Sequence, residues 1–430
     1  MYIIHQDEEI HRERTLLVGV EWPTVTSQTV RDHLDELAQL TDTAGGVIVG
    51  EVIQKRQRPE AATFIGKGKV ESLVAQAIAL KCHFIIFDDD LTPSQQKNLQ
   101  QIAGDDISIM DRSALILNIF SQHAQTREAK TQVELAQMEY NLPRLAGLWT
   151  HLERQRGATG TRGGPGESQI EVDRRITRTR IAQLKKELKK ITKERFTQRQ
   201  KRAGAFRVAL AGYTNTGKST LLNAMTGASV YIEDQLFATL DTTTRKMTLA
   251  HHAPILLSDT VGFIRKLPHH LVASFRSTLA EIAEADLILK VLDISSPHIN
   301  EHHATISEVL HEMGIDDKPS LLVLNKMDLL EDTGRIQAIR RQFPEAIIIS
   351  ARRKLKLDDL ESAILKVYNQ DFREAVLRVT PQQSRLVHTI YQAVEVEHQT
   401  YDGDTAVFTV RGRESILRSL QDQISQMDKS

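Results

Sequence analysis

The chain has 430 residues, a formal net charge of −1 at pH 7 and a single cysteine. At roughly 150 residues per domain, this length predicts two to four domains. One cysteine excludes a disulfide framework and favours a reducing compartment, and no apolar run approaches the roughly 18 residues that span a membrane. Because the polar N-terminus also lacks the apolar core of a signal peptide, we expect a cytoplasmic protein with no integral membrane segment. We take it to be a monomer.

Residues 1–125 alternate short β-like runs with helical stretches, which predicts a small, mostly parallel α/β domain. We expect strands at Thr15–Val20, Gly46–Val49, Phe84–Phe87 and Ser108–Met110, and helices at Val70–Leu80, Ser94–Ile102 and Ala114–Ala124. Two motifs in this domain are ambiguous. Gly66–Lys69 (GKGK) could grip phosphate, but a solvated turn is the simpler interpretation. Asp88–Asp90 could hold a metal, but an acidic loop at a helix start is the safer interpretation.

Residues 126–202 place two helical stretches on either side of a glycine-rich loop. The first stretch, Val133–Leu152, contains Pro143 as a kink or break. The second, residues 170–196, carries apolar residues at heptad spacing. This order predicts a long antiparallel helical hairpin with the glycines of residues 157–166 at its tip.

The second arm of this hairpin is strongly basic, with 13 Lys or Arg and two Glu from Arg174 to Arg202. A charge run is usually only a solvated face. A long arm that ends in a flexible, arginine-bearing loop, however, suits insertion into a crowded RNA site, so RNA contact is preferred over an inert linker. The candidate RNA-contact residues are Arg154, Arg156, Arg162, Gly163, Gly164, Arg174 and Arg175.

A phosphate-binding motif lies near the start of the next segment, residues 203–371. Residues 212–219 read GYTNTGKS, the spacing G-x-x-x-x-G-K-[ST], between an apolar run and a helical stretch. Glycines let backbone N–H groups approach an anion, and the helix that follows offers its first N–H groups. Lys218 would reach the β- and γ-phosphates, and the Ser219 hydroxyl would ligate Mg²⁺. The expected nucleotide contacts are Gly212, Tyr213, Thr214, Asn215, Thr216, Gly217, Lys218, Ser219 and Thr220.

Two later segments have the composition of nucleotide-sensing switches. Residues 235–245 are polar and threonine-rich, and a hydroxyl there would bind Mg²⁺ and the γ-phosphate. Thr239 is preferred for this role, with Thr242–Thr244 as competitors. In the second segment, Asp259 would hold Mg²⁺ through water, and the Gly262 N–H would sense the γ-phosphate. The expected contacts of both segments are Phe237, Ala238, Thr239, Asp259, Thr260, Val261 and Gly262.

Phe263 follows the second segment directly, where Ras-like proteins carry the glutamine that orients the attacking water. Phenylalanine can neither accept a proton nor orient water. We therefore name no certain catalytic residue, and we expect slow intrinsic hydrolysis that a partner accelerates.

Residues 325–328 (NKMD) predict specificity for guanine. A carboxylate at Asp328 would accept hydrogen bonds from N1–H and the 2-amino group of guanine. Adenine offers neither donor, which gives a discrimination on the order of 10⁴ or more. The remaining expected base-side contacts are Asn325, Lys326, Met327, Ser350, Ala351 and Arg352. The order and spacing of these motifs predict a Ras-like P-loop GTPase domain, with GTP as substrate and Mg²⁺ as cofactor.

Residues 372–430 are the least informative part of the chain. We expect strands at Val376–Val379, Glu395–Thr400 and Thr405–Val410, the last two joined by a hairpin turn at Asp402-Gly403, and a helix at Ser415–Met427. This is a small α+β domain. Docking to another protein and a purely stabilising role are equally compatible with it.

Several motifs together resemble the HflX family of translation-associated GTPases. They are GYTNTGKSTLLN, FATLDTTTR, DTVGFIRKLP, NKMD, DRSALILNIFSQHAQTREAKTQVELAQMEYNLPRL and GESQIEVDRR, and the match covers roughly residues 45–370. The resemblance implies an N-terminal α/β domain with a helical hairpin, a Ras-like GTPase domain and a short C-terminal domain. It also implies binding to the large ribosomal subunit, with the hairpin loop near the peptidyl-transferase region, and splitting of stalled or idle ribosomes under stress. Thr242 departs from the family pattern, which usually has proline there.

An alternative from another class is an ATP-dependent, helicase-like enzyme that remodels RNA and uses its GTPase domain for regulation. Some family members are described as binding ATP through the N-terminal domain, so ATP is a candidate partner of residues 1–125. Only Gly66–Lys69 could serve there, because the sequence contains no second full nucleotide motif. A signalling GTPase with a protein partner is a third reading, and the basic charge of the hairpin argues against it.

Overall fold

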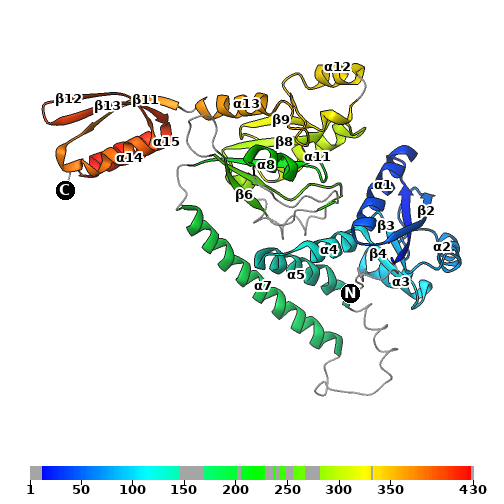
Figure 1. Ribbon diagram of the computed structural model, residues 1–430. Helices are drawn as coiled ribbons and strands as arrows, with labels where there is room; N and C mark the ends of the chain where they lie inside the picture. The colour runs from blue at the N-terminus through cyan, green and yellow to red at the C-terminus, as the bar shows by residue number, and fades with distance from the viewer. Residues whose placement is uncertain are drawn as a thin grey trace. The chain divides into compact units, whose positions relative to one another are not determined.

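The computed structural model describes residues 12–145, 169–200, 205–227, 236–237, 242–247, 255–266, 281–330, 333–370 and 372–427 (Figure 1). Its contacts divide the chain into two compact units. The first unit comprises residues 1–195, 233–241 and 264–278, and the second comprises residues 196–232, 242–263 and 279–430. The first expected switch segment, residues 235–245, is therefore divided between the two units, and the second, residues 259–262, belongs to the second unit. The expected four-domain boundaries stay a prediction.

A four-stranded sheet in the order β2-β1-β3-β4 organises the start of the first unit. Its strands are β1 (Arg14–Glu21), β2 (Val47–Lys55), β3 (Phe84–Phe87) and β4 (Ser108–Asp111), and every pairing is parallel. The helices that alternate with them are α1 (Ser27–Thr43), α2 (Lys67–Ala79), α3 (Pro93–Ala103) and α4 (Arg112–His123). All four side chains of β3 are buried, as expected for a strand covered on both faces. The predicted parallel α/β domain is confirmed, with α1 as an additional helix.

Two antiparallel helices follow, α5 (Arg127–Asn141) and α7 (Gln169–Gln200). Their direction follows from the ion pairs, because Arg127 pairs with Glu187 and Glu134 with Arg180. The helix α5 gives way to a 3-10 turn, η1 (Leu142–Arg144), which contains Pro143. The expected break at Pro143 is thus confirmed, because proline fits the first turn of a helix and not its interior. The glycine-rich loop lies outside the described residues.

The second unit contains a six-stranded sheet in the order β10-β9-β8-β5-β7-β6. The strands are β5 (Phe206–Gly212), β6 (Thr243–Met247), β7 (Ile255–Asp259), β8 (Leu287–Asp293), β9 (Ser320–Asn325) and β10 (Ile347–Ile348). Only β6 is antiparallel to its neighbour among these strands. The helical elements are α8 (Lys218–Thr226), α11 (Ile299–Glu312), η2 (Met327–Leu329), α12 (Thr333–Gln342) and α13 (Leu357–Gln370). Because β5, β7, β9 and β10 are parallel, the motifs that follow them meet at one edge of the sheet.

The C-terminal part of the second unit is a three-stranded antiparallel sheet in the order β11-β13-β12. Its elements are β11 (Phe372–Val379), η3 (Pro381–Gln383), α14 (Arg385–Ala393), β12 (Glu395–Asp402), β13 (Thr405–Arg413) and α15 (Glu414–Met427). The helices contribute Ile390 and Leu417 to a core with Leu377 and Phe408. The predicted α+β composition is confirmed, and α14 is an additional helix. No helix in the described parts of the chain is long and apolar enough to cross a membrane.

Candidate nucleotide site

The loop between β5 and α8 is shaped by glycines. A Cβ at Gly212 would lie 2.5 Å from the carbonyl oxygen of Val291, and a Cβ at Gly217 would lie 2.4 Å from Nδ2 of Asn325. Gly217 also has a φ of +85°, which favours glycine. The N-cap residue of α8 is Gly217, which has no side chain to cap the first N–H groups. The first N–H groups of α8 are therefore open toward the loop, and Gly212 and Gly217 fill positions where a Cβ would clash. Both features suit an anion site.

Lys218 is buried at the centre of this loop. Its Nζ donates to the carbonyl oxygens of Gly212, at 3.1 Å, and Tyr213, at 2.7 Å. Burial lowers the pKa of Lys218 to about 8, against the opposing effect of the Asp259 carboxylate. A desolvated ammonium is stabilised by an anion placed beside it, so this lysine is electrostatically suited to a phosphate.

Ser219 and Asp259 form the oxygen-rich side of the site. The Ser219 hydroxyl donates to Oδ2 of Asp259 at 2.6 Å, and Asp259 is fully buried at the end of β7. The Thr214 hydroxyl is buried and has no hydrogen-bond partner among the described residues. A Cβ at Gly262 would lie 2.8 Å from the Cα of Thr214. Hydroxyl and carboxylate oxygens are hard donors of the kind that Mg²⁺ prefers, so these residues fit the ion that the sequence predicts.

The base-side motif is tied to the phosphate loop through Asn325. Its Nδ2 donates to the Thr216 carbonyl at 2.9 Å, and its Oδ1 accepts from the Ala351 N–H at 2.9 Å. The hydroxyl of Ser350 donates to Oδ1 of Asp328 at 2.5 Å. This bond holds the Asp328 carboxylate in one orientation. A carboxylate that accepts from two donors of a base needs such an orientation.

The other residues of this motif have structural contacts or face solvent. Lys326 has a φ of +67°, and its Nζ lies 2.9 Å from Oδ2 of Asp293. The Met327 N–H donates to the Ile349 carbonyl at 3.1 Å. Arg352 is exposed at the rim.

Phe263 extends the phosphate loop by strand-like bonds. Its N–H donates to the Gly212 carbonyl at 2.9 Å, and its carbonyl accepts from the Thr214 N–H at 2.8 Å. The Phe263 side chain is 2 % exposed. The phosphate loop also has an aromatic contact that the sequence does not predict. The Tyr213 ring stacks on the ring of His302, with centroids 4.0 Å apart. No sequence motif links a histidine on α11 to this loop.

The first switch segment is described only in part. Phe237 belongs to the first unit, where its buried ring meets Phe120 edge to face, with centroids 4.7 Å apart. Ala238 and Thr239 lie outside the described residues. Of the competing threonines, Thr244 lies in β6, and its hydroxyl bonds the Ser258 hydroxyl at 2.9 Å.

The two ambiguous motifs of the N-terminal domain take structural roles. Gly66 precedes α2, and its N–H donates to Oε1 of Gln54 at 3.2 Å. Asp88 pairs with the cations Arg112 and Lys266. Among the described residues, no group of three or more His, Cys, Asp or Glu could hold a metal ion.

The structure describes only two of the RNA-contact candidates. Arg174 and Arg175 lie on α7, with Arg175 exposed and Arg174 partly buried. The candidates that lie outside the described residues are Arg154, Arg156, Arg162, Gly163 and Gly164.

Three family models match the chain along most of its length. A GTP-binding GTPase N-terminal model matches residues 31–121, a GTP-binding GTPase middle-region model matches residues 123–202, and a 50S ribosome-binding GTPase model matches residues 207–326. A GTP-binding protein from Sulfolobus solfataricus, solved with GDP, is 23% identical with a TM-score of 0.43, over 83% of this chain and 98% of that one.

Curated relatives of the chain carry the name GTPase HflX, and two of them illustrate the similarity. The relative from Flavobacterium psychrophilum is 51% identical over 75% of this chain and 77% of its own length. The relative from Escherichia coli K12 is 39% identical over 92% of each chain. A match over 92% of the chain includes the nucleotide site, the hairpin and most of the N-terminal domain. The chain therefore belongs to the HflX family of GTPases.

Proposed function

We propose that this GTPase is a GTP-gated factor that binds the large ribosomal subunit and splits stalled or idle ribosomes under stress. GTP would order the switch segments, the hairpin would enter ribosomal RNA near the peptidyl-transferase region, and hydrolysis would permit release. The observation that carries the proposal is the match to a 50S ribosome-binding GTPase model in a chain whose preceding helix, α7, is strongly basic.

The charges of α7 support this role because they fall into two sets. Arg180 pairs with Glu134 of α5 and stays within the hairpin. Arg178, Lys186 and Lys189 are exposed, and their spacing places them on the side of the helix opposite the buried Leu184. A row of cations along one helix face suits successive phosphates of an RNA backbone.

The geometry of the site supports roles for the nucleotide residues that the sequence predicts. Residues 212–220 would cradle the phosphates, and Asp328 would read guanine. Ser219 and Asp259 would hold Mg²⁺, with Thr239 as the further ligand predicted from the sequence. The ion would neutralise charge on the phosphates. Because Phe263 cannot orient water, hydrolysis would be slow in the free protein and stimulated by the ribosome.

A GTPase assay with and without purified large subunits tests the proposal. We expect the subunits to raise the rate at least tenfold in the wild type and to have no effect on the Ser219→Ala variant. Sedimentation with GDP, with a non-hydrolysable triphosphate and without nucleotide measures gating. Equal binding in all three states would refute the proposal.

A deletion within residues 157–166 isolates the role of the hairpin loop. We expect this variant to bind GTP normally and to lose splitting of 70S particles in sucrose gradients. Normal splitting by the variant would show that the loop assignment is wrong.

A further inference from the structure

Two loops at the carboxyl edge of the N-terminal sheet are locked to each other. The loop after β3 contains Asp88 and Asp90, and the segment after β4 contains Arg112 and Ser113. Nη1 of Arg112 lies 2.7 Å from Oδ1 of Asp88, and the Ser113 hydroxyl donates to Asp90. Asp88, Arg112 and Ser113 are all buried. We call residues 88–91 and 111–113 the edge network.

Lys266, three residues beyond Phe263, holds one side of the edge network. Its Nζ lies 2.5 Å from Oδ2 of Asp88 and 2.7 Å from Oδ1 of Asp89. Burial lowers the pKa of the Lys266 ammonium, but the two aspartates raise it more and keep the group charged. An ion pair with a buried partner is directional and hard to replace, so it fixes the position of the chain around Lys266.

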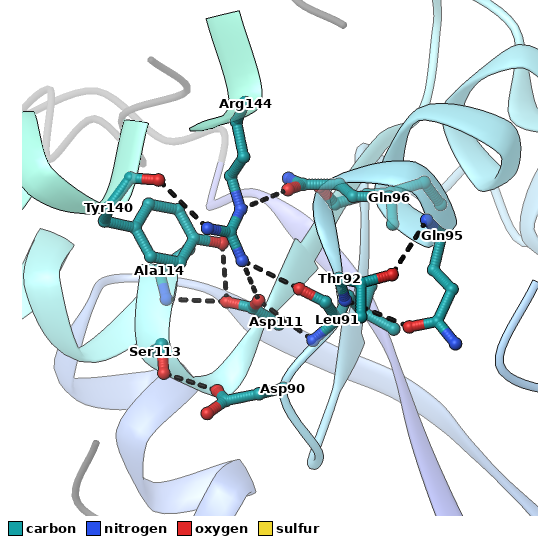
Figure 2. Close-up of polar contacts among 11 residues, drawn as sticks. Asp90, Leu91, Thr92, Gln95, Gln96, Asp111, Ser113, Ala114, Tyr140 and Arg144 are labelled. Carbon is teal, nitrogen blue, oxygen red and sulfur yellow. Dashed lines mark hydrogen bonds and ion pairs between the residues drawn. The ribbon is translucent and has the colours of Figure 1, made fainter. Parts of the chain in front are cut away.

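The root of the hairpin holds the other side, as Figure 2 shows. Arg144, the last residue of η1, directs Nη2 to the Leu91 carbonyl at 2.7 Å and to Oδ2 of Asp111 at 3.4 Å. Its Nε donates to Oε1 of Gln96 at 2.9 Å. The Tyr140 hydroxyl donates to Oδ1 of Asp111 at 2.8 Å. The last turn that the structure describes before the glycine-rich loop is therefore fixed to the same residues.

The network thus has Lys266, four residues beyond Gly262, on one side and the hairpin root on the other. The four consecutive residues 88–91 make the contacts to both sides. Asp88 and Asp89 contact Lys266, and the Leu91 carbonyl accepts from Arg144. Only residues 264 and 265 separate Lys266 from Phe263, and Phe263 makes two backbone hydrogen bonds to the phosphate loop. A shift of the segment that follows Gly262 must move Lys266 or break its pair.

We infer that Lys266 is a positioning residue that couples the second switch segment to the root of the hairpin through the edge network. The coupling gives the nucleotide a physical means to set the orientation of the hairpin arms, and it rests on the proposed function for its biological use. It requires no contact between Lys266 and the nucleotide.

Hydrogen exchange of the full-length protein, without ribosomes, tests this inference. In the wild type we expect the backbone amides of residues 140–145 to change exchange rate by about threefold or more when GDP is replaced by a non-hydrolysable GTP analogue. In Lys266→Gln this response should vanish, while fluorescent-nucleotide affinity stays within about twofold of the wild-type value. Lys266→Arg should retain the response, because it keeps the charge. Lys366→Gln, at an exposed position on α13, is the matched control.

The outcomes separate this inference from the proposed function. A wild-type hairpin root that does not respond to the nucleotide, or a Lys266→Gln root that responds fully, would overturn the inference. A root that responds only when Lys266 is charged supports it, even if the same protein fails to bind large subunits. That second failure would refute the proposed function alone.

Discussion

At the scale of single residues, His33 reports on the charges around Lys266. Its Nδ1 lies 3.7 Å from Oδ2 of Asp88, and its side chain also faces the cations Lys266, Arg265 and Arg112. Burial and then the Lys266 charge lower the pKa of His33 to about 4, although Asp88 acts in the opposite direction. The imidazole is therefore neutral in the folded protein at pH 7.

This shift predicts a loss of stability in acid. The unfolded chain binds a proton at His33 near pH 6.5 and the folded chain only near pH 4, so the free energy of unfolding falls as the pH falls through this range. The slope from this group is about 1.4 kcal/mol per pH unit at most. Urea unfolding at several pH values measures it, and His33→Gln should flatten the curve. An NMR titration of His33 in Lys266→Gln should give a higher pKa than in the wild type. An unchanged pKa would contradict the placement of Lys266.

A second residue-scale prediction concerns base recognition. Asp328→Asn replaces a charged double acceptor with an amide that cannot accept from both N1–H and the 2-amino group. Hydrogen bonds to a charged group contribute roughly 1.5–3 kcal/mol each, so GTP affinity should fall by about 10² or more. Ser350→Ala leaves the carboxylate but removes the bond that orients it, and should cost less. Equilibrium titration with a fluorescent guanine nucleotide measures both variants. Equal losses would argue that Asp328 does not contact the base.

At the scale of elements, Arg144 fixes η1 to the end of β4, to the loop after β3 and to α3. Arg144→Gln would leave the fully buried Asp111 without its cation, and burial already raises the pKa of that carboxyl. We expect a loss of about 1–3 kcal/mol of stability, with faster hydrogen exchange along α5. Arg144→Lys keeps the charge but loses the planar guanidinium, so its stability should lie between that of the wild type and that of Arg144→Gln. Unchanged exchange in α5 would show that the anchor contributes little.

Local chemistry explains which elements the sequence predicts correctly. The strand, loop and helix around Lys218 follow from the motif spacing and from the apolar and helical stretches that flank it, and the proline at 143 ends α5 wherever the helix packs. The prediction does not include the amphipathic helix α1, although Val30, Leu34 and Leu37 follow a helical period. The pair of Asp88 and Lys266 could not be predicted, because 178 positions separate the two residues and no motif links them.

At the scale of the whole molecule, a net charge of −1 hides a strong local asymmetry. The basic residues of α7 are balanced by acidic residues elsewhere in the chain, so the proposed RNA affinity would depend on this helix rather than on the overall charge. Each cation that neutralises a phosphate releases a counterion, so affinity falls with salt in proportion to the number of such contacts.

Affinity falls as the salt concentration rises. Replacing Arg178, Lys186 and Lys189 together by Gln should therefore reduce the steepness of log affinity against log salt concentration by about two to three. The matched control replaces Lys354, Lys356 and Lys366, three exposed lysines of the GTPase part, and should leave the slope unchanged. Binding of both variants to large subunits, with a non-hydrolysable triphosphate at several salt concentrations, measures the difference. Since none of the six residues belongs to the nucleotide site, GTP affinity should stay constant in both. Equal slopes in the two variants would mean that the exposed face of α7 does not meet phosphate, and RNA contact would then have to come from another part of the chain.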